Sequence, residues 1–133
     1  MKNSVGMKLI DALGERYGIQ LSTSDWDVLE CYGGISLSPG IIDSLCAVAN
    51  RLGDETITAY EMESLHKEFK PLRTRLGKEG IRAIRDDLMS HFDLVILPDS
   101  LRWAIATTSE METFIFGPME FLTAVSLGGK GAE

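Results

Sequence analysis

The side chains that most readily perform chemistry are few in this chain and widely spaced. The two imidazoles, His66 and His91, and the two thiols, Cys31 and Cys46, follow no spacing that a familiar zinc motif uses. Each histidine falls near the end of a predicted helix, where the helix dipole alone favours it. We therefore expect no metal site, and we expect free thiols, because an intracellular protein keeps its cysteines reduced.

Motifs for catalysis are also missing from the sequence. It contains no GxSxG, P-loop, GxGxxG or HExxH pattern. Gly33 and Gly34 lack the third glycine and the following lysine of a phosphate-binding loop, and they more simply end a helix. Asp86 and Asp87 form the kind of carboxylate pair that exposed helix surfaces usually carry. We expect a protein that is not an enzyme and that binds no cofactor.

Basic residues concentrate in one segment, residues 65–91, although the whole chain has a net charge of −7. On a helical wheel Lys78, Arg82 and Arg85 share one face, and Arg75 joins them if the helix begins early. This stripe could bind a phosphate or an acidic partner. The simpler interpretation, which we prefer, is a solvated helix face whose charges are balanced by neighbouring carboxylates.

The overall acidity, with an isoelectric point near 4.8, argues against nucleic acid as a partner and favours a basic one. Many proteins are acidic only because the charge keeps them soluble, and that alternative stays open. One acidic stretch places Asp25, Asp27 and Glu30 around Trp26. An exposed tryptophan among carboxylates could anchor a protein interface, whereas a buried one would belong to the core.

The positions of these residues depend on helices that apolar periodicity predicts. The first covers residues 4–17 and ends at Gly18. Another begins at Pro39 and ends at Gly53, and its broad apolar face, which includes Cys46, is typical of a central helix.

Three further helices rest on weaker signals. Hydroxyl side chains at residues 22–24 predict the start of a short helix that carries Trp26. Thr58 and Glu61 match a capping box and predict a fourth helix after them. A fifth helix is expected over residues 78–91. The sequence thus predicts about five helices before any strand.

The period of the apolar residues changes after these helices. Three runs then predict a small antiparallel sheet of three strands, DLVILP, RWAIATT and ETFIFG, and a short element follows from Pro118. Helices first and strands last define the α+β class. We expect one domain over residues 1–127 and a flexible tail over residues 128–133.

The last two strands form a hairpin after a basic helix, the order found in winged-helix proteins that bind DNA. The hairpin tip carries Glu110 and Glu112 and no cation, so it would repel phosphate. The hairpin is therefore predicted to be core sheet. Its alternation would bury Trp103 and expose Ala104 and Ala106, leaving a smooth face that a partner or a helix could cover.

No apolar run approaches the roughly 20 residues that cross a bilayer. Polar and charged residues interrupt the N-terminal stretch MKNSVGMKLIDALGERYG, which excludes a signal peptide. We expect a cytoplasmic protein without membrane contact.

One segment, HFDLVILPDSLRWAIATTSEMETFIFGP, resembles the C-terminal part of small bacterial immunity proteins of contact-dependent and other polymorphic toxin systems. The resemblance covers about 28 of 133 residues and rests on Trp103, Phe114, Phe116 and Gly117. It implies a single-domain cytoplasmic protein without catalytic residues. Against a basic toxin such a protein would be acidic, because complementary charge speeds capture.

The function that these observations favour is non-enzymatic binding that neutralises a cognate basic toxin. The expected contact residues are Asp25, Trp26, Asp27 and Glu30. One alternative is a phage-type inhibitor that mimics the charge of DNA. Another is a small nucleic-acid-binding or anion-binding regulator that uses Arg75, Lys78, Arg82 and Arg85. An enzyme without a known motif is the last.

Overall fold

The computed structural model describes residues 4–31, 39–62, 71–84, 93–108 and 113–131. These residues contain four helices, α1 (Ser4–Tyr17), α2 (Pro39–Arg51), α3 (Lys78–Ile84) and α4 (Met119–Gly131). They also contain six strands, β1 (Trp26–Cys31), β2 (Thr56–Glu61), β3 (Leu72–Arg75), β4 (Leu94–Pro98), β5 (Ala104–Thr107) and β6 (Thr113–Pro118). No helix in the described ranges has the length and apolar character needed to cross a membrane.

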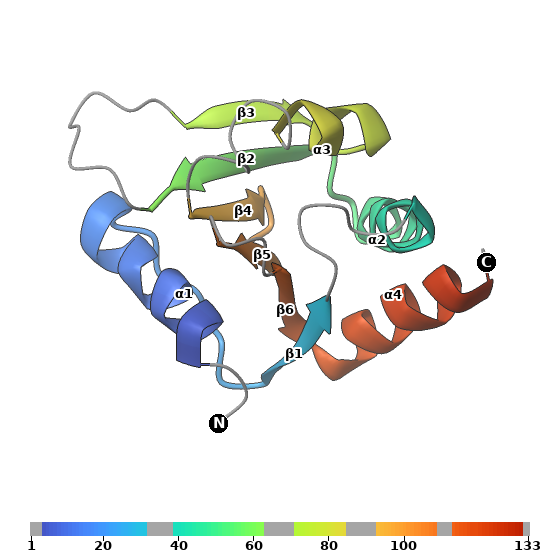
Figure 1. The fold of residues 1–133 in the computed structure, drawn as a ribbon, viewed down its shortest axis with the longest axis horizontal. Coiled ribbons are helices and arrows are strands. Elements are labelled where there is room, and N and C mark those ends of the chain that lie inside the picture. The colour runs from blue at the N-terminus through green and yellow to red at the C-terminus, as the bar shows by residue number, and fades with distance from the viewer. Residues whose placement is uncertain (1–3, 32–38, 63–70, 85–92, 109–112, 132–133) are drawn as a thin grey trace.

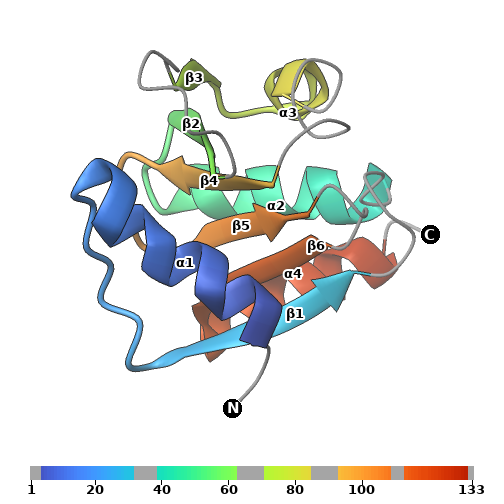
Figure 2. The same ribbon diagram turned by 60° about the vertical axis from the view of Figure 1, so that its left-hand side comes forward.

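The six strands form one antiparallel sheet in the order β1-β6-β5-β4-β2-β3, so β1 and β3 are its edges. Figure 1 shows α1 on one side of the sheet and α2 with α4 on the other. The view in Figure 2 shows the same three layers, with α3 beside β3. The fold is α+β and richer in sheet than the sequence predicts.

Two apolar cores follow from the alternation of side chains along the strands. Ile96, Ile105 and Ile115 point to the core under α2 and α4, which we call the α2/α4 core. Val95 and Phe114 point to the core under α1, which we call the α1 core. Strand β4 is buried along its whole length, which confirms the prediction that DLVILP is covered on both faces.

The termini of α1 and α2 agree with the sequence prediction. Gly18 after α1 has a φ of 69° and Gly53 after α2 has a φ of 94°. Residues other than glycine rarely adopt this left-handed backbone conformation, so a glycine is favoured where each helix ends. Tyr17 fixes the end of α1 to the sheet, because its hydroxyl donates a hydrogen bond of 2.7 Å to the carbonyl oxygen of Glu61.

The predicted second helix is wrong, because residues 26–31 form the edge strand β1. The segment WDVLEC has apolar residues at both helical and alternating spacing. Pairing with β6, from Trp26 opposite Pro118 to Cys31 opposite Thr113, decides between the two. The hydroxyl-rich residues before it form a turn in which the Trp26 amide donates to the Thr23 carbonyl at 3.0 Å.

The predicted fourth helix is also wrong, because Thr58 and Glu61 lie in β2 rather than in a capping box. The segment TITAYE contains β-branched and aromatic residues, and it pairs with β3 on one side and β4 on the other. Burial of both its faces outweighs the local capping signal. The fifth helix is present as α3 over Lys78–Ile84, and the rest of its predicted span lies outside the described residues.

The three predicted strands are confirmed as β4, β5 and β6, but the sheet has six strands and not three. The element expected after Pro118 is the helix α4. It runs to Gly131, beyond residue 127, where the sequence analysis ends the domain.

The predicted exposure of Ala104 and Ala106 is wrong, whereas the covering of their face by a helix, one of the two coverings that the sequence allows, is confirmed. Ala104 and Ala106 are fully buried in the α1 core. Their small side chains let α1 pack closely against β5, so the protein's own N-terminal helix covers the face that the sequence analysis left open. Trp103 is buried, as predicted.

Candidate functional site

The acidic stretch that the sequence singles out lies at the β1 edge of the sheet. Asp25 is exposed in the turn before β1, and Asp27 is half-buried within the strand. Trp26 is half-buried and packs against the α1 core, so it is a core side chain at least in part and not a fully exposed anchor. Glu30 belongs to β1, and its side chain lies outside the described set. These residues share a strand edge and not a helix surface.

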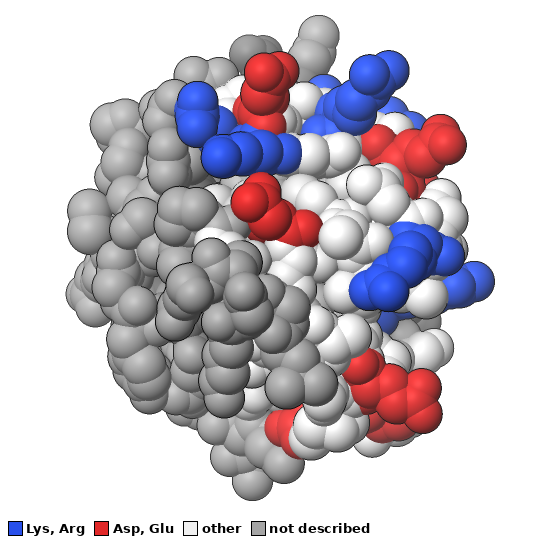
Figure 3. All heavy atoms as spheres, turned by 90° about the vertical axis from the view of Figure 1, so that its right-hand side faces the viewer, with Lys and Arg blue, Asp and Glu red and all other residues white. Residues whose placement is uncertain are grey.

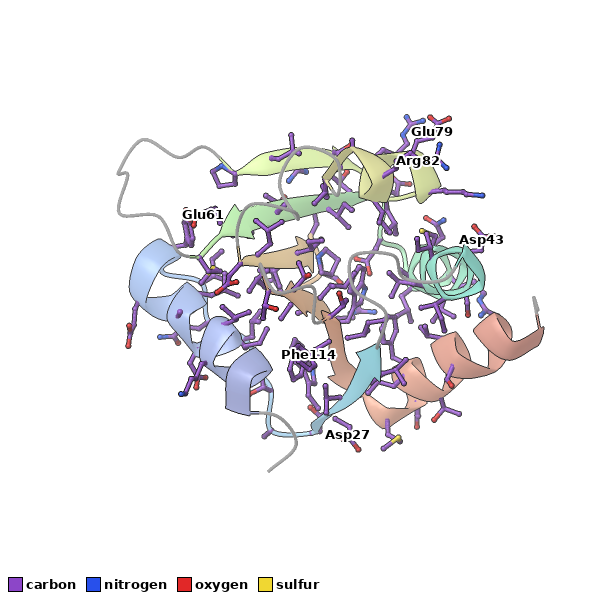
Figure 4. The ribbon with its side chains drawn as sticks, in the orientation of Figure 1. Asp27, Asp43, Glu61, Glu79, Arg82 and Phe114 are labelled. Atoms are coloured by element: carbon purple, nitrogen blue, oxygen red, sulfur yellow. The ribbon has the colours of Figure 1, made fainter. Side chains whose placement is uncertain are left out.

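An apolar groove of about 250 Å³ runs between this edge and α4 (Figure 4 shows Asp27 near the start of α4). Its lining residues are Val28, Leu29, Met119, Leu122, Thr123 and Ser126. Met119 is 55% exposed, which is high for a large apolar side chain. The sequence pattern does not predict the groove, because it favours a helix at Val28 and Leu29 and only a short element after Pro118.

The lining residues of the groove fall within residues 28–29 and 119–126, and every charged residue in the second of these ranges and in the three residues before Val28 is a carboxylate. These carboxylates are Asp25, Asp27 and Glu120. Asp25 and Glu120 are exposed. The register pairs Trp26 with Pro118, and so brings the turn that holds Asp25 to the residues where α4 begins. An apolar groove bordered by carboxylates suits a partner with both cationic and apolar side chains.

Three of the four residues of the predicted basic stripe lie in the described part of the structure. Arg75 ends β3 and Lys78 begins α3, and both border a pocket of about 330 Å³ at the β3–α3 connection. Glu79 borders the same pocket. Arg82 is exposed on α3, and Figure 4 shows it beside Glu79. The last member, Arg85, lies outside the described residues.

The surface that carries α2, α3 and α4 shows Lys and Arg side chains interspersed with Asp and Glu (Figure 3). Such mixing is typical of a solvated surface rather than of an anion-binding one. Arg73, on the neighbouring part of β3, forms a two-bond ion pair with Asp99 at 2.9 and 3.0 Å. Both side chains are more than half exposed, so this pair contributes little to stability.

No metal-binding cluster occurs in the part of the chain that the structure describes. No three His, Cys, Asp or Glu side chains there lie close enough together to hold an ion. His66 and His91 fall outside the described residues. Cys46 is a buried free thiol in the α2/α4 core, in agreement with its predicted core position.

Burial, and next the charge of Asp43, raise the pKa of the Cys46 thiol to about 11. The thiolate is the reactive form, so we expect Cys46 to label very slowly in the native protein at pH 8. Labelling with a disulfide reagent in a Cys31→Ser variant measures this. Full labelling in urea is the control, and native labelling as fast as in urea would contradict the burial.

The same pKa predicts how stability changes with pH. The folded state favours the neutral thiol, so the contribution of Cys46 is fully present below the ordinary pKa of 9.0 and declines as pH rises toward 11. We expect the wild-type chain to lose more stability between these pH values than a Cys46→Ala variant does. Parallel urea titrations across that range check the difference, and equal losses would contradict it.

The chain matches no family model, no curated protein and no solved structure.

Proposed function

We propose that this protein is a non-enzymatic binding protein of the cytoplasm that captures and neutralises a basic protein, as an immunity protein does with its toxin. The observation that carries the proposal is the set of carboxylates, Asp25, Asp27 and Glu120, around the apolar groove between β1 and α4. No cationic residue occurs in residues 25–29 or 119–126, the ranges that contain these carboxylates and the lining residues.

The physical basis is charge complementarity combined with apolar burial. A net charge of −7 attracts a basic partner at long range and speeds encounter. Carboxylates at the rim of an interface mainly raise the association rate, whereas apolar contacts at its centre supply most of the affinity. The groove offers both elements within one surface.

Affinity capture from native lysate tests this proposal when two charge-matched variants are compared. The first is Asp25→Asn/Asp27→Asn, at the groove. The second is Asp11→Asn/Glu15→Gln, which removes the same charge from exposed positions on α1, across the sheet from α4. We expect wild type and the α1 variant to retain one basic protein in stoichiometric amount, and the groove variant to lose most of it.

Two results would contradict the proposal. Equal retention of the basic protein by wild type and both variants would show that the groove is not part of the interface. Capture of nucleic acid that moderate salt releases would instead favour the basic stripe, because phosphate contacts are strongly salt-dependent.

A further inference from the structure

We infer that the groove between β1 and α4 receives an apolar side chain of the basic partner, and that the partner docks through side chains rather than by adding a strand to the sheet. This inference rests on the proposed function and specifies how the same surface binds. An edge strand normally invites strand addition, so the two modes have to be distinguished.

The lining of the groove suits an apolar side chain flanked by polar groups. Leu122 is buried at 4% exposure, whereas Met119 is 55% exposed and Thr123 is exposed. Methionine is flexible and adapts its shape to an incoming side chain. An apolar group packed against Met119 and Leu122 would be removed from contact with water. It would also lie next to β1, the strand that contains Asp27.

The hydrogen bonds along the sheet determine which amides of β1 face its free edge. Along an antiparallel strand, the backbone N–H and C=O groups of successive residues point alternately toward one neighbouring strand and toward the other. The Met62 amide bonds to the Asp93 carbonyl and the Leu76 amide to the Glu55 carbonyl, which fixes this alternation at β2. Following the register through β4, β5 and β6 assigns Asp27 and Leu29 to the bonds between β1 and β6.

The amides of Trp26 and Val28 consequently point away from β6, and each has an acceptor within the chain. Trp26 donates to the Thr23 carbonyl at 3.0 Å, and Val28 donates to Oδ1 of Asp27 at 2.9 Å. A strand added here would have to displace both bonds. The two outward amides at the start of this edge, next to the groove, are therefore occupied, which disfavours main-chain pairing there while the groove itself stays open.

Charge complementarity identifies the occupant as a segment with cations on both sides of an apolar residue. Asp25 and Asp27 lie along the β1 rim, and Glu120 lies in the first turn of α4. Lysine or arginine beside the inserted residue would meet a carboxylate from either rim. We take the pentapeptide KKFKK, acetylated and amidated, as the smallest probe with this chemistry.

A nuclear magnetic resonance titration of the full chain at low salt tests the inference. We expect KKFKK to shift the methyl signals of Met119 and Leu122 and to bind about tenfold more tightly than KKGKK, because Phe buries apolar area that Gly lacks. N-methylation at two adjacent residues of KKFKK removes one amide donor from each strand edge and places a methyl group there, which blocks strand pairing on both edges. The N-methylated analogue should bind as tightly as KKFKK.

Two variants with the same change of charge localise the binding. Met119→Lys places a cation in the groove and is expected to abolish the Phe advantage. Leu52→Lys changes another exposed apolar residue, 42% exposed and outside the groove lining, and should leave binding unchanged. Equal loss in both variants would overturn the inference, as would a large loss on N-methylation.

The outcomes also separate this inference from the proposed function. Equal, salt-sensitive binding of KKFKK and KKGKK would keep the attraction of a cationic partner and overturn the insertion of an apolar side chain. Binding of neither peptide would overturn the inference and count against the acidic surface as well.

Discussion

Replacing Trp103 with Ala is expected to lower the free energy of unfolding by about 3–5 kcal/mol, the usual cost of removing a buried large aromatic side chain. Trp103 is fully buried in the α2/α4 core. Its ring stacks on Phe121 with centroids 5.6 Å apart, and its Nε1 donates a hydrogen bond of 3.0 Å to Oδ2 of Asp54. The substitution therefore removes apolar contacts and leaves a buried carboxylate without its indole donor.

Urea unfolding followed by far-ultraviolet circular dichroism measures this loss without relying on tryptophan fluorescence. Trp103→Phe keeps much of the stacking on Phe121 but removes the N–H donor, so it should cost less than the Ala variant. Asp54→Asn keeps an acceptor oxygen and should be the mildest of the three. A Trp103→Ala loss below about 1 kcal/mol would contradict the assignment of Trp103 to a packed core.

The second large effect concerns Gly80 in α3. A Cβ atom built there would meet the carbonyl oxygen of Arg75, which belongs to the backbone at the end of β3. Backbone cannot move aside as a flexible side chain can, so Gly80→Ala would force α3 away from β3. We expect a loss of about 2–3 kcal/mol, at the upper end of the range for overpacked sites.

Gly77→Ala is the matched control, because a Cβ at Gly77 meets nothing within 4 Å and the residue has no positive φ. It should change stability by less than about 0.5 kcal/mol, as ordinary surface substitutions do. Similar stabilities for the two variants would show that α3 does not pack on β3 as described.

The strands in the second half of the chain could be predicted because sequence pattern and environment agree there. DLVILP is apolar at every position and too short for a helix, and it became the fully buried β4. The same holds for the helices α1 and α2, whose apolar stripes and terminal glycines give one consistent interpretation.

The strands β1 and β2 could not be predicted in this way because distant partners decide their structure. WDVLEC pairs with β6, about 90 residues further along the chain, and TITAYE lies between β3 and β4. The local capping signal at Thr58 and Glu61 favours a helix, and the sequence alone does not reveal the two neighbouring strands whose pairing overrides it. The tendency of a segment to form a strand depends strongly on such cross-strand neighbours. The tendency to form a helix depends less on the rest of the fold.

The candidate site was predicted in part. The sequence alone reveals the carboxylates Asp25 and Asp27, because charge is visible without a structure. It could not place Glu120 and Met119 beside them, since that proximity follows from the pairing of β1 with β6. The groove exists only because this pairing brings the start of α4 against the β1 edge.

The most direct test of the proposed acidic binding surface is the association rate constant between this chain and a basic protein recovered by the affinity capture, measured at low and physiological salt. We predict a rate that falls steeply with salt and that drops about tenfold or more at low salt in Asp25→Asn/Asp27→Asn but not in Asp11→Asn/Glu15→Gln. Equal rates for the two variants, or a rate that salt leaves unchanged, would contradict the claim that the carboxylates beside β1 capture the partner.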